Sequence, residues 1–208
     1  MKKIILGFVL FLLIGVFGVN AEEQNIFTYP KLGFTITKPV NWQVTSAEDY
    51  FKNLDRVTTL ENAEFMEMAK KYATVPLVAF SKYLEPYDDI NPGIKVHFKY
   101  RESLPGFAGK GPKEIIEVSL LTFEQVFKDF KIIEGPMDTD VSGIASAYVK
   151  YQYTLTIPDG RGFPACSEMW VIPRGNYFYL IVVGRRQDAS TQDLEDIKQM
   201  MSSIKIEH

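Results

Sequence analysis

Apolar and polar residues alternate along much of the chain, which is the pattern of half-buried β-strands. Residues 25–29 and 34–38 alternate in this way on either side of Pro30-Lys31-Leu32-Gly33, which predicts a β-hairpin. Two further extended runs cover about 75–84 and 94–102. The first half of the chain therefore contributes at least four strands.

The second half predicts a meander of longer strands. Three runs rich in Tyr and β-branched residues, separated by short turns with Pro and Gly, cover residues 144–157, 163–172 and 177–185. A shorter strand is expected at 130–134, ending in a turn at Gly135-Pro136. Residues 204–206 form a possible edge strand.

Three stretches have the helical period instead. Residues 46–72 contain two capping boxes, Ser46-x-x-Asp49 and Thr58-x-x-Glu61. Residues 113–129 form the clearest helix, and a last helix begins at the capping box Ser190-x-x-Asp193. The apolar stripes of these two helices are Ile116, Leu120, Phe123, Phe127 and Phe130, and Leu194, Ile197 and Met201.

Hairpins interrupted by a few amphipathic helices indicate an α+β fold with an antiparallel β-sheet. Because each helix has one apolar stripe, we expect helices to flank the sheet on both faces. Residues 22–208 suit one domain, with a helical insertion near 46–72.

The first residues resemble a secretory signal peptide. Met1-Lys2-Lys3 is basic, residues 4–19 carry no charge, and Val19-Asn20-Ala21 is a small-residue cleavage site followed by two acids. We expect cleavage after Ala21 and an exported protein, periplasmic or extracellular. The alternative is an uncleaved segment that tethers the domain to a membrane.

Net charge and cysteine content limit the partners and the covalent bonds that the protein can form. Removing Lys2 and Lys3 with the leader changes the formal net charge from −3 to −5, which disfavours nucleic acid and anionic membranes as partners. Cys166 is the only cysteine, so no intrachain disulfide forms, and we expect it to be a buried small hydrophobe.

Several short motifs together resemble the PsbP-like domain family. They are Tyr29-x-x-x-Gly33-Phe34-x-Ile36-x-x-Pro39-x-x-Trp42, Ser142-Gly143-Ile144-Ala145, the group Tyr177, Tyr179 and Leu180, and Ser202-Ser203-Ile204. The resemblance covers most of 27–206 and implies an αβα sandwich around an antiparallel sheet. Members of the family mostly bind other proteins and assist assembly, and are not typically enzymes. The matching positions are turn and core residues, so no site residue transfers.

The sharpest local motif is Asp138-Thr139-Asp140-Val141-Ser142-Gly143, which has the spacing of the first six positions of an EF-hand loop. Asp138, Asp140 and Ser142 are the candidate calcium ligands. The twelfth position is Val149 instead of Glu, and a strand follows instead of a helix. The competing interpretation is a tight turn in which Asp and Ser cap backbone amides.

No catalytic constellation stands out. His97 is the only histidine before the terminal His208, and it lies in a strand without a G-x-S-x-G motif. The glycine-rich loop at 103–112 lacks the Walker spacing, although it precedes a helix that could hold an anion. Arg185-Arg186 is expected to be a surface pair. We predict no cofactor and no enzymatic activity.

Four aromatic residues in or beside the two long loops are candidate partner-binding anchors: Tyr83, Tyr87, Tyr100 and Phe107. The alternative is that they pack beneath their own loops. The sequence thus favours an exported, non-enzymatic protein that binds another exported or envelope protein. The alternative is a small-ligand or calcium-binding module that uses the 138–143 turn or the 103–112 loop.

Overall fold

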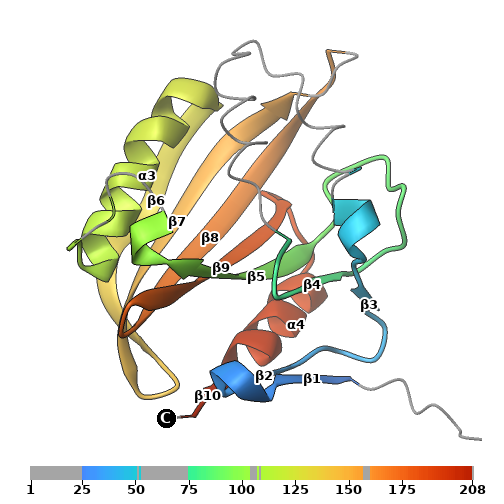
Figure 1. Cartoon of the computed structure of the whole chain (residues 1–208). Helices are drawn as coiled ribbons and strands as arrows, with labels where there is room; N and C mark the ends of the chain where they lie inside the picture. The colour runs from blue at the N-terminus through green and yellow to red at the C-terminus, as the bar shows by residue number, and fades with distance from the viewer. Residues whose placement is uncertain are drawn as a thin grey trace, which may run out of the picture.

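A seven-stranded antiparallel sheet forms the centre of the protein (Figure 1). The computed structural model describes residues 25–50, 52, 75–103, 107, 109–156 and 160–207. The strand order is β3-β4-β5-β9-β8-β7-β6. The strands are β3 Gln43–Val44, β4 Val78–Ser81, β5 Gly93–Tyr100, β6 Lys128–Val141, β7 Ile144–Thr156, β8 Gly162–Arg174 and β9 Tyr177–Arg186.

The predicted N-terminal hairpin is confirmed and belongs to a second, three-stranded sheet. Its strands are β1 Ile26–Tyr29, β2 Phe34–Thr37 and β10 Lys205–Ile206, with β2 in the middle. The hairpin turn is a single 3-10 turn that ends at Gly33, with φ of +61°. A Cβ at Gly33 would lie 2.8 Å from the carbonyl oxygen of Glu207, the residue after β10, so this close approach requires glycine.

The helices α3 (Pro112–Val126) and α4 (Thr191–Ser202) belong to two different hydrophobic cores. Helix α3 packs over β6, β7 and β8, in one core with Phe178, whereas α4 shares the other core with Tyr179. Phe178 and Tyr179 are neighbours on β9 and therefore point to opposite faces. The α+β class with an antiparallel sheet is confirmed. The layer that contains α4 is mixed, because Phe34 and Ile36 of the small sheet enter the same core.

Two details of the second half differ from expectation. The predicted turn at Gly135-Pro136 is wrong, because β6 continues through both residues with irregular pairing to β7. An edge strand tolerates a proline, which lacks an N–H, and Gly135 takes a φ of +81° there. The predicted helix over 113–129 ends at Val126, so Phe130 lies on β6 instead.

The buried face of α4 also differs from the predicted one. Leu194 is 43% exposed, whereas the carboxylates of Asp193 and Asp196 are buried. Asp196 Oδ2 accepts a 2.9 Å hydrogen bond from the indole of Trp42, which has no exposed surface. Buried carboxylates need donors, and Trp42 supplies one from the segment between β2 and β3.

The predicted helical insertion is only partly within the described residues. The Ser46 half of the first capping box is confirmed: the Asp49 amide donates to Ser46 Oγ at 3.0 Å, and residues 47–50 are helical. Thr58 and Glu61, with most of the insertion, lie outside the described residues, as do residues 1–24 with the signal sequence. Within the described part of the chain, no helix combines the length and hydrophobicity needed to cross a membrane.

Candidate functional site

The 138–143 segment is a hairpin turn between β6 and β7. Ser142 and Gly143 are its two central residues, with φ of +57° and +76°, as in a type I′ turn. Asp140 Oδ1 accepts from the Gly143 amide at 2.8 Å, and Ser142 Oγ accepts from the Ile206 amide at 2.9 Å. The predicted tight turn is therefore present, and these two oxygens bond to the protein's own backbone.

Asp138, the remaining calcium candidate, lies on β6 opposite Ala147 and is exposed. Across the described ranges, no group of three or more His, Cys, Asp and Glu side chains is arranged to hold a metal ion. Asp140 and Ser142 of the motif therefore accept hydrogen bonds from backbone amides at a hairpin turn.

The loop between β4 and β5 carries two of the candidate aromatic residues, the exposed Tyr83 and the half-buried Tyr87. The rings of Tyr83 and Tyr87 are stacked, with centroids 4.7 Å apart and planes inclined by 16°. Tyr83 is 40% exposed, and Leu84 beside it is 75% exposed. We call residues 82–92 the tyrosine loop. Burial raises the pKa of Tyr87, and the nearby tyrosine and Asp89 add to this effect, so its hydroxyl stays protonated at neutral pH.

Hydrogen bonds inside the tyrosine loop fix its backbone. The Asn91 side chain bonds both the amide and the carbonyl of Tyr83, at 3.0 and 2.8 Å. It also donates to Glu85 Oε1 at 3.0 Å, while Glu85 Oε2 accepts from the Tyr87 amide at 2.9 Å. The two tyrosines are therefore joined through Asn91 and Glu85 as well as through their rings.

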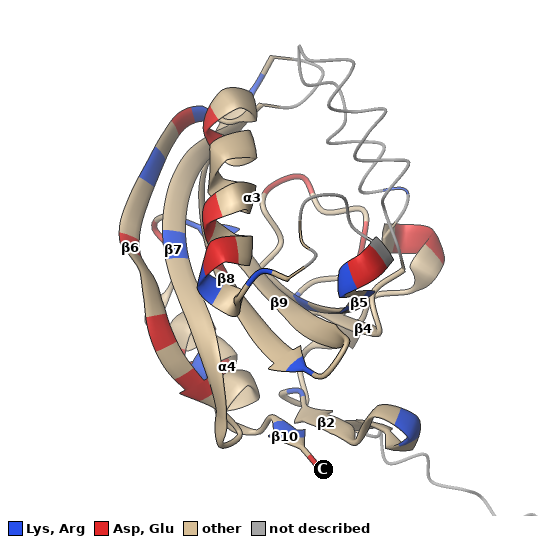
Figure 2. Ribbon diagram, turned by 60° about the vertical axis from the view of Figure 1, so that its left-hand side comes forward, with Lys and Arg blue, Asp and Glu red and all other residues tan. Residues whose placement is uncertain are grey.

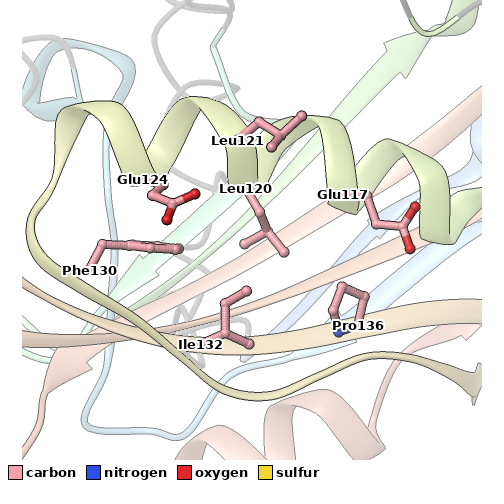
Figure 3. Close-up of a pocket in the computed structure, with 7 residues that line it drawn as sticks. All are labelled: Glu117, Leu120, Leu121, Glu124, Phe130, Ile132 and Pro136. Atoms are coloured by element: carbon pink, nitrogen blue, oxygen red, sulfur yellow. The ribbon is translucent and has the colours of Figure 1, made fainter.

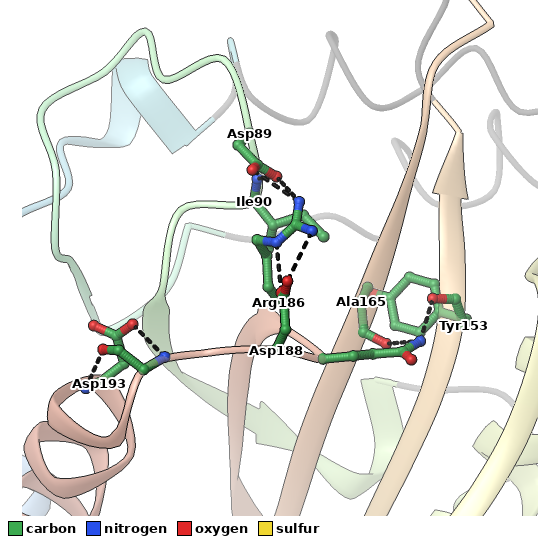
Figure 4. Close-up of polar contacts among 9 residues, drawn as sticks. Asp89, Ile90, Tyr153, Ala165, Arg186, Asp188 and Asp193 are labelled. Atoms are coloured by element: carbon green, nitrogen blue, oxygen red, sulfur yellow. Dashed lines mark hydrogen bonds and ion pairs between the residues drawn. The ribbon is translucent and has the colours of Figure 1, made fainter.

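Ion pairs attach the tyrosine loop to the rest of the protein (Figure 4). Arg186, the last residue of β9, donates to Asp89 Oδ2 at 2.9 Å and to Asp188 Oδ1 at 2.7 Å. Hydrogen bonds to Asp188 and Asp89 raise the pKa of Arg186, which stays charged. At the other end of the loop, Lys82 pairs with Asp193 of α4. The loop is thus tied to β9 and to α4.

The other two aromatic candidates lie elsewhere. Tyr100 is 51% exposed at the far end of β5, about 24 Å along the strand from the tyrosine loop. It lines a pocket of about 430 Å³ together with Tyr29 and Lys31. Phe107 packs against the core beneath α3, with its ring 6.3 Å from that of Phe178. The structure therefore brings only Tyr83 and Tyr87 together.

The start of α3 uses its own residues as a cap. Gly111 donates its amide to Glu114 Oε2 at 2.7 Å. Arg101 bonds the carbonyl oxygens of Lys110 and Gly175, which joins this segment to the β8–β9 turn. The described part of the 103–112 loop is therefore a capped helix start.

His97 lies on the α3 face of β5 between Lys95 and Lys99, which alternation places on the same face. Burial, together with the charges of Lys99 and Lys95, lowers the pKa of His97 to about 4. Its Nδ1 is buried and has no hydrogen-bond partner among the described residues. The imidazole is therefore neutral at physiological pH.

The prediction of a surface pair at Arg185-Arg186 is wrong for Arg185. Its side chain is 5% exposed and pairs with Glu168 Oε1 at 2.6 Å, and Tyr148 donates to Glu168 Oε2 at 2.9 Å. The alternation of β9 contains the missed signal, because Arg185 follows the buried Val183 at a spacing of two. Cys166, opposite Arg185 on β8, is buried as expected.

Comparisons with known proteins support the fold. No protein-family model matches the sequence, and no curated protein matches it either. Among solved structures, cyanobacterial PsbP (CyanoP) from Synechocystis sp. PCC 6803 matches with a TM-score of 0.51 and 11% identity, over 88% of this chain and 91% of that one. LpqN, involved in cell envelope biogenesis of Mycobacterium tuberculosis, matches with a TM-score of 0.50 and 9% identity, over 84% and 83%. At these identities the likeness concerns architecture alone, and on that ground the chain has a PsbP-like fold.

Proposed function

We propose that this protein is an exported accessory protein that binds another exported or envelope protein through the tyrosine loop. The observation that carries the proposal is the stacked pair of Tyr83 and Tyr87 on a loop fixed by hydrogen bonds and ion pairs. We take the scaffold to be the αβα sandwich that the PsbP-like resemblance implies. The protein has no enzymatic role in this proposal.

Two properties of the tyrosine loop favour binding: the size of its exposed side chains and the preorganisation of its backbone. Tyrosine offers a large, rigid and amphipathic contact surface at low cost in side-chain entropy, and is enriched at binding hot spots. Leu84 adds an aliphatic side chain that is 75% exposed. Because Asn91 and Arg186 already fix the loop, binding does not have to order it, which favours affinity.

Export is the second part of the proposal. It is supported by the basic, apolar and small-residue order of residues 1–21. Cys166, 1% exposed, leaves no reactive thiol on the described surface, which suits an oxidising compartment. LpqN, which has a similar structure and is involved in cell envelope biogenesis, is consistent with an envelope role.

Site-specific photo-crosslinking tests the docking surface. A benzophenone amino acid replaces Tyr83 in the full chain expressed in its own cells, and Tyr29 is replaced in a matched control, because the two side chains are 40% and 38% exposed. We expect a discrete adduct from position 83 that is absent from position 29. When the benzophenone amino acid stands at another position of the tyrosine loop, the yield of its adduct should fall once Tyr87→Ala and Leu84→Ala are introduced.

Two results would contradict the proposal. Equal labelling from positions 83 and 29 would mean that the tyrosine loop is not a docking surface. Export is tested separately by determining the N-terminus of the isolated protein, which should be Glu22. Recovery of an intact Met1 terminus in the cytoplasmic fraction would contradict export while leaving the docking test valid.

A further inference from the structure

A groove runs between α3 and the edge strand β6 (Figure 3). Its volume is about 440 Å³. Leu120 and Leu121 line it from the helix, and Phe130, Ile132 and Pro136 line it from the strand. It is therefore an apolar trough.

The trough is open at the surface and closed beneath. Leu121 is 63% exposed and Ile132 is 42% exposed, which is unusual for large aliphatic side chains brought together in one groove. Leu120, by contrast, is 6% exposed, and the Phe130 ring lies 5.5 Å from that of Tyr151 in the core. The floor is part of the packed core, so the shape of the groove is fixed.

Two carboxylates stand at the helix rim of the trough. Glu117 and Glu124 line it on either side of Leu121 and lie on the acidic surface of α3 (Figures 2 and 3). They are seven positions apart on the helix, a rise of about 10 Å. Neither has an ion-pair or hydrogen-bond partner among the described residues, and both are exposed. The groove thus combines an apolar centre with two exposed carboxylates that form no ion pair within the described residues.

The edge of β6 argues for docking through side chains. Pairing of β6 with β7 is irregular between Ile132 and Met137, and Pro136 has no N–H to offer to an added strand. A continuous ladder with a partner strand is therefore blocked along the groove. A helix that inserts its side chains avoids this obstacle.

We propose that the α3–β6 groove binds a basic amphipathic helix of a second protein, with leucine-sized side chains in the trough and two Lys or Arg residues on Glu117 and Glu124. A second copy of this chain is a poorer occupant, because a two-fold interface would place two equally acidic grooves together. The proposal is independent of the tyrosine loop. Four strands of the sheet lie between β4 and β6, which places the two surfaces about 24 Å apart.

A synthetic helical peptide tests the proposal directly. The probe carries two lysines seven residues apart and two leucines three and four residues after the first lysine, so that all four share one face. A control peptide of the same composition has its leucines on the opposite face. Binding to the full-length protein is measured by fluorescence anisotropy at low ionic strength. We expect a Kd below about 1 mM for the probe and at least a fivefold weaker Kd for the control.

Variants of the protein locate the binding. We expect Glu117→Lys with Glu124→Lys, and separately Leu121→Ala, to weaken probe binding by roughly fivefold or more each. Glu195→Lys reverses one charge on the exposed surface of α4, as each of the two Glu→Lys changes does on α3, and should leave the Kd unchanged. Unchanged melting temperatures confirm that the substituted proteins are folded.

The inference would be overturned by no binding of the probe, by equal binding of the two peptides, or by equal weakening with Glu195→Lys. The last two would mean non-specific attraction to an acidic protein. Concentration-dependent self-association that Leu121→Ala abolishes would also overturn it, because the occupant would then be a second copy.

Discussion

The hydrogen bond between Trp42 and Asp196 gives the sharpest test of what holds α4 on the sheet. Trp42→Phe removes the indole donor, 2.9 Å from Asp196 Oδ2, while Gln192 still donates to Oδ1 at 2.8 Å. Asp196 is 4% exposed, so water does not readily replace the lost donor.

The size of the effect follows from two contributions. A hydrogen bond to a charged group contributes about 1.5–3 kcal/mol, and the smaller phenylalanine ring leaves a void that costs roughly 1 kcal/mol more. The expected loss in the free energy of unfolding is therefore about 2.5–4 kcal/mol. For a domain of this length that corresponds to a fall in Tm of roughly 5–16 °C.

Urea unfolding followed by far-UV circular dichroism measures the loss without relying on tryptophan fluorescence. Trp170→Phe is the matched control, because the Trp170 indole makes no hydrogen bond within the described residues, and it should cost less. A double-mutant cycle of Trp42→Phe with Asp196→Leu isolates the pair, and we expect a coupling energy of about 1.5–3 kcal/mol. A coupling energy below about 0.5 kcal/mol would refute this reasoning.

Three further predictions concern pH, loop order and calcium. The pKa of His97 is about 4 in the folded protein and 6.5 ordinarily, so the unfolded chain binds the proton first and stability is lost as the pH falls from 6.5 to 4. His97→Asn should remove up to about 3 kcal/mol of this pH dependence, measured by urea unfolding at pH 4.5 and 7.5. Parallel pH profiles of the variant and the unchanged protein would contradict the prediction. Arg186→Gln should accelerate amide exchange around Asp89 with little effect on exchange in β9, whereas unchanged exchange in the loop would show that the ion pair does not order it. Calcium should not raise the melting temperature, and a rise that Asp138→Ala or Asp140→Ala abolishes would establish a site at this turn.

Strand positions were predictable from sequence because alternation is a local signal. The runs at 144–157, 163–172 and 177–185 correspond to β7, β8 and β9 within a few residues. The turn predicted at Gly135-Pro136 was wrong for a specific reason. The dipeptide marks a turn in general, but an edge strand also accepts it, and edge position is decided by the strand order.

Site features were less predictable because they depend on contacts between distant segments. Asp193 appears in the sequence as the fourth and last residue of a capping box, and the capping role is confirmed, but its pairing with Lys82 joins residues more than a hundred positions apart. The stacking of Tyr83 on Tyr87 is local, but the loop that carries both rings is held by the ion pair between Asp89 and Arg186 of β9. The α3–β6 groove, likewise, exists only once the helix packs beside the edge strand.

The small sheet has a mechanical consequence. β1 and β10 both pair antiparallel with β2, so they run parallel to each other, and Ile26 lies at the Thr37 end of β2 while Ile206 lies at the Phe34 end. Tension applied through residues 26 and 206 pulls these strands lengthwise in opposite directions. It loads the ladder in shear, so that its hydrogen bonds share the force instead of breaking one after another. A domain pulled between these two points would resist extension until the whole small sheet yields at once.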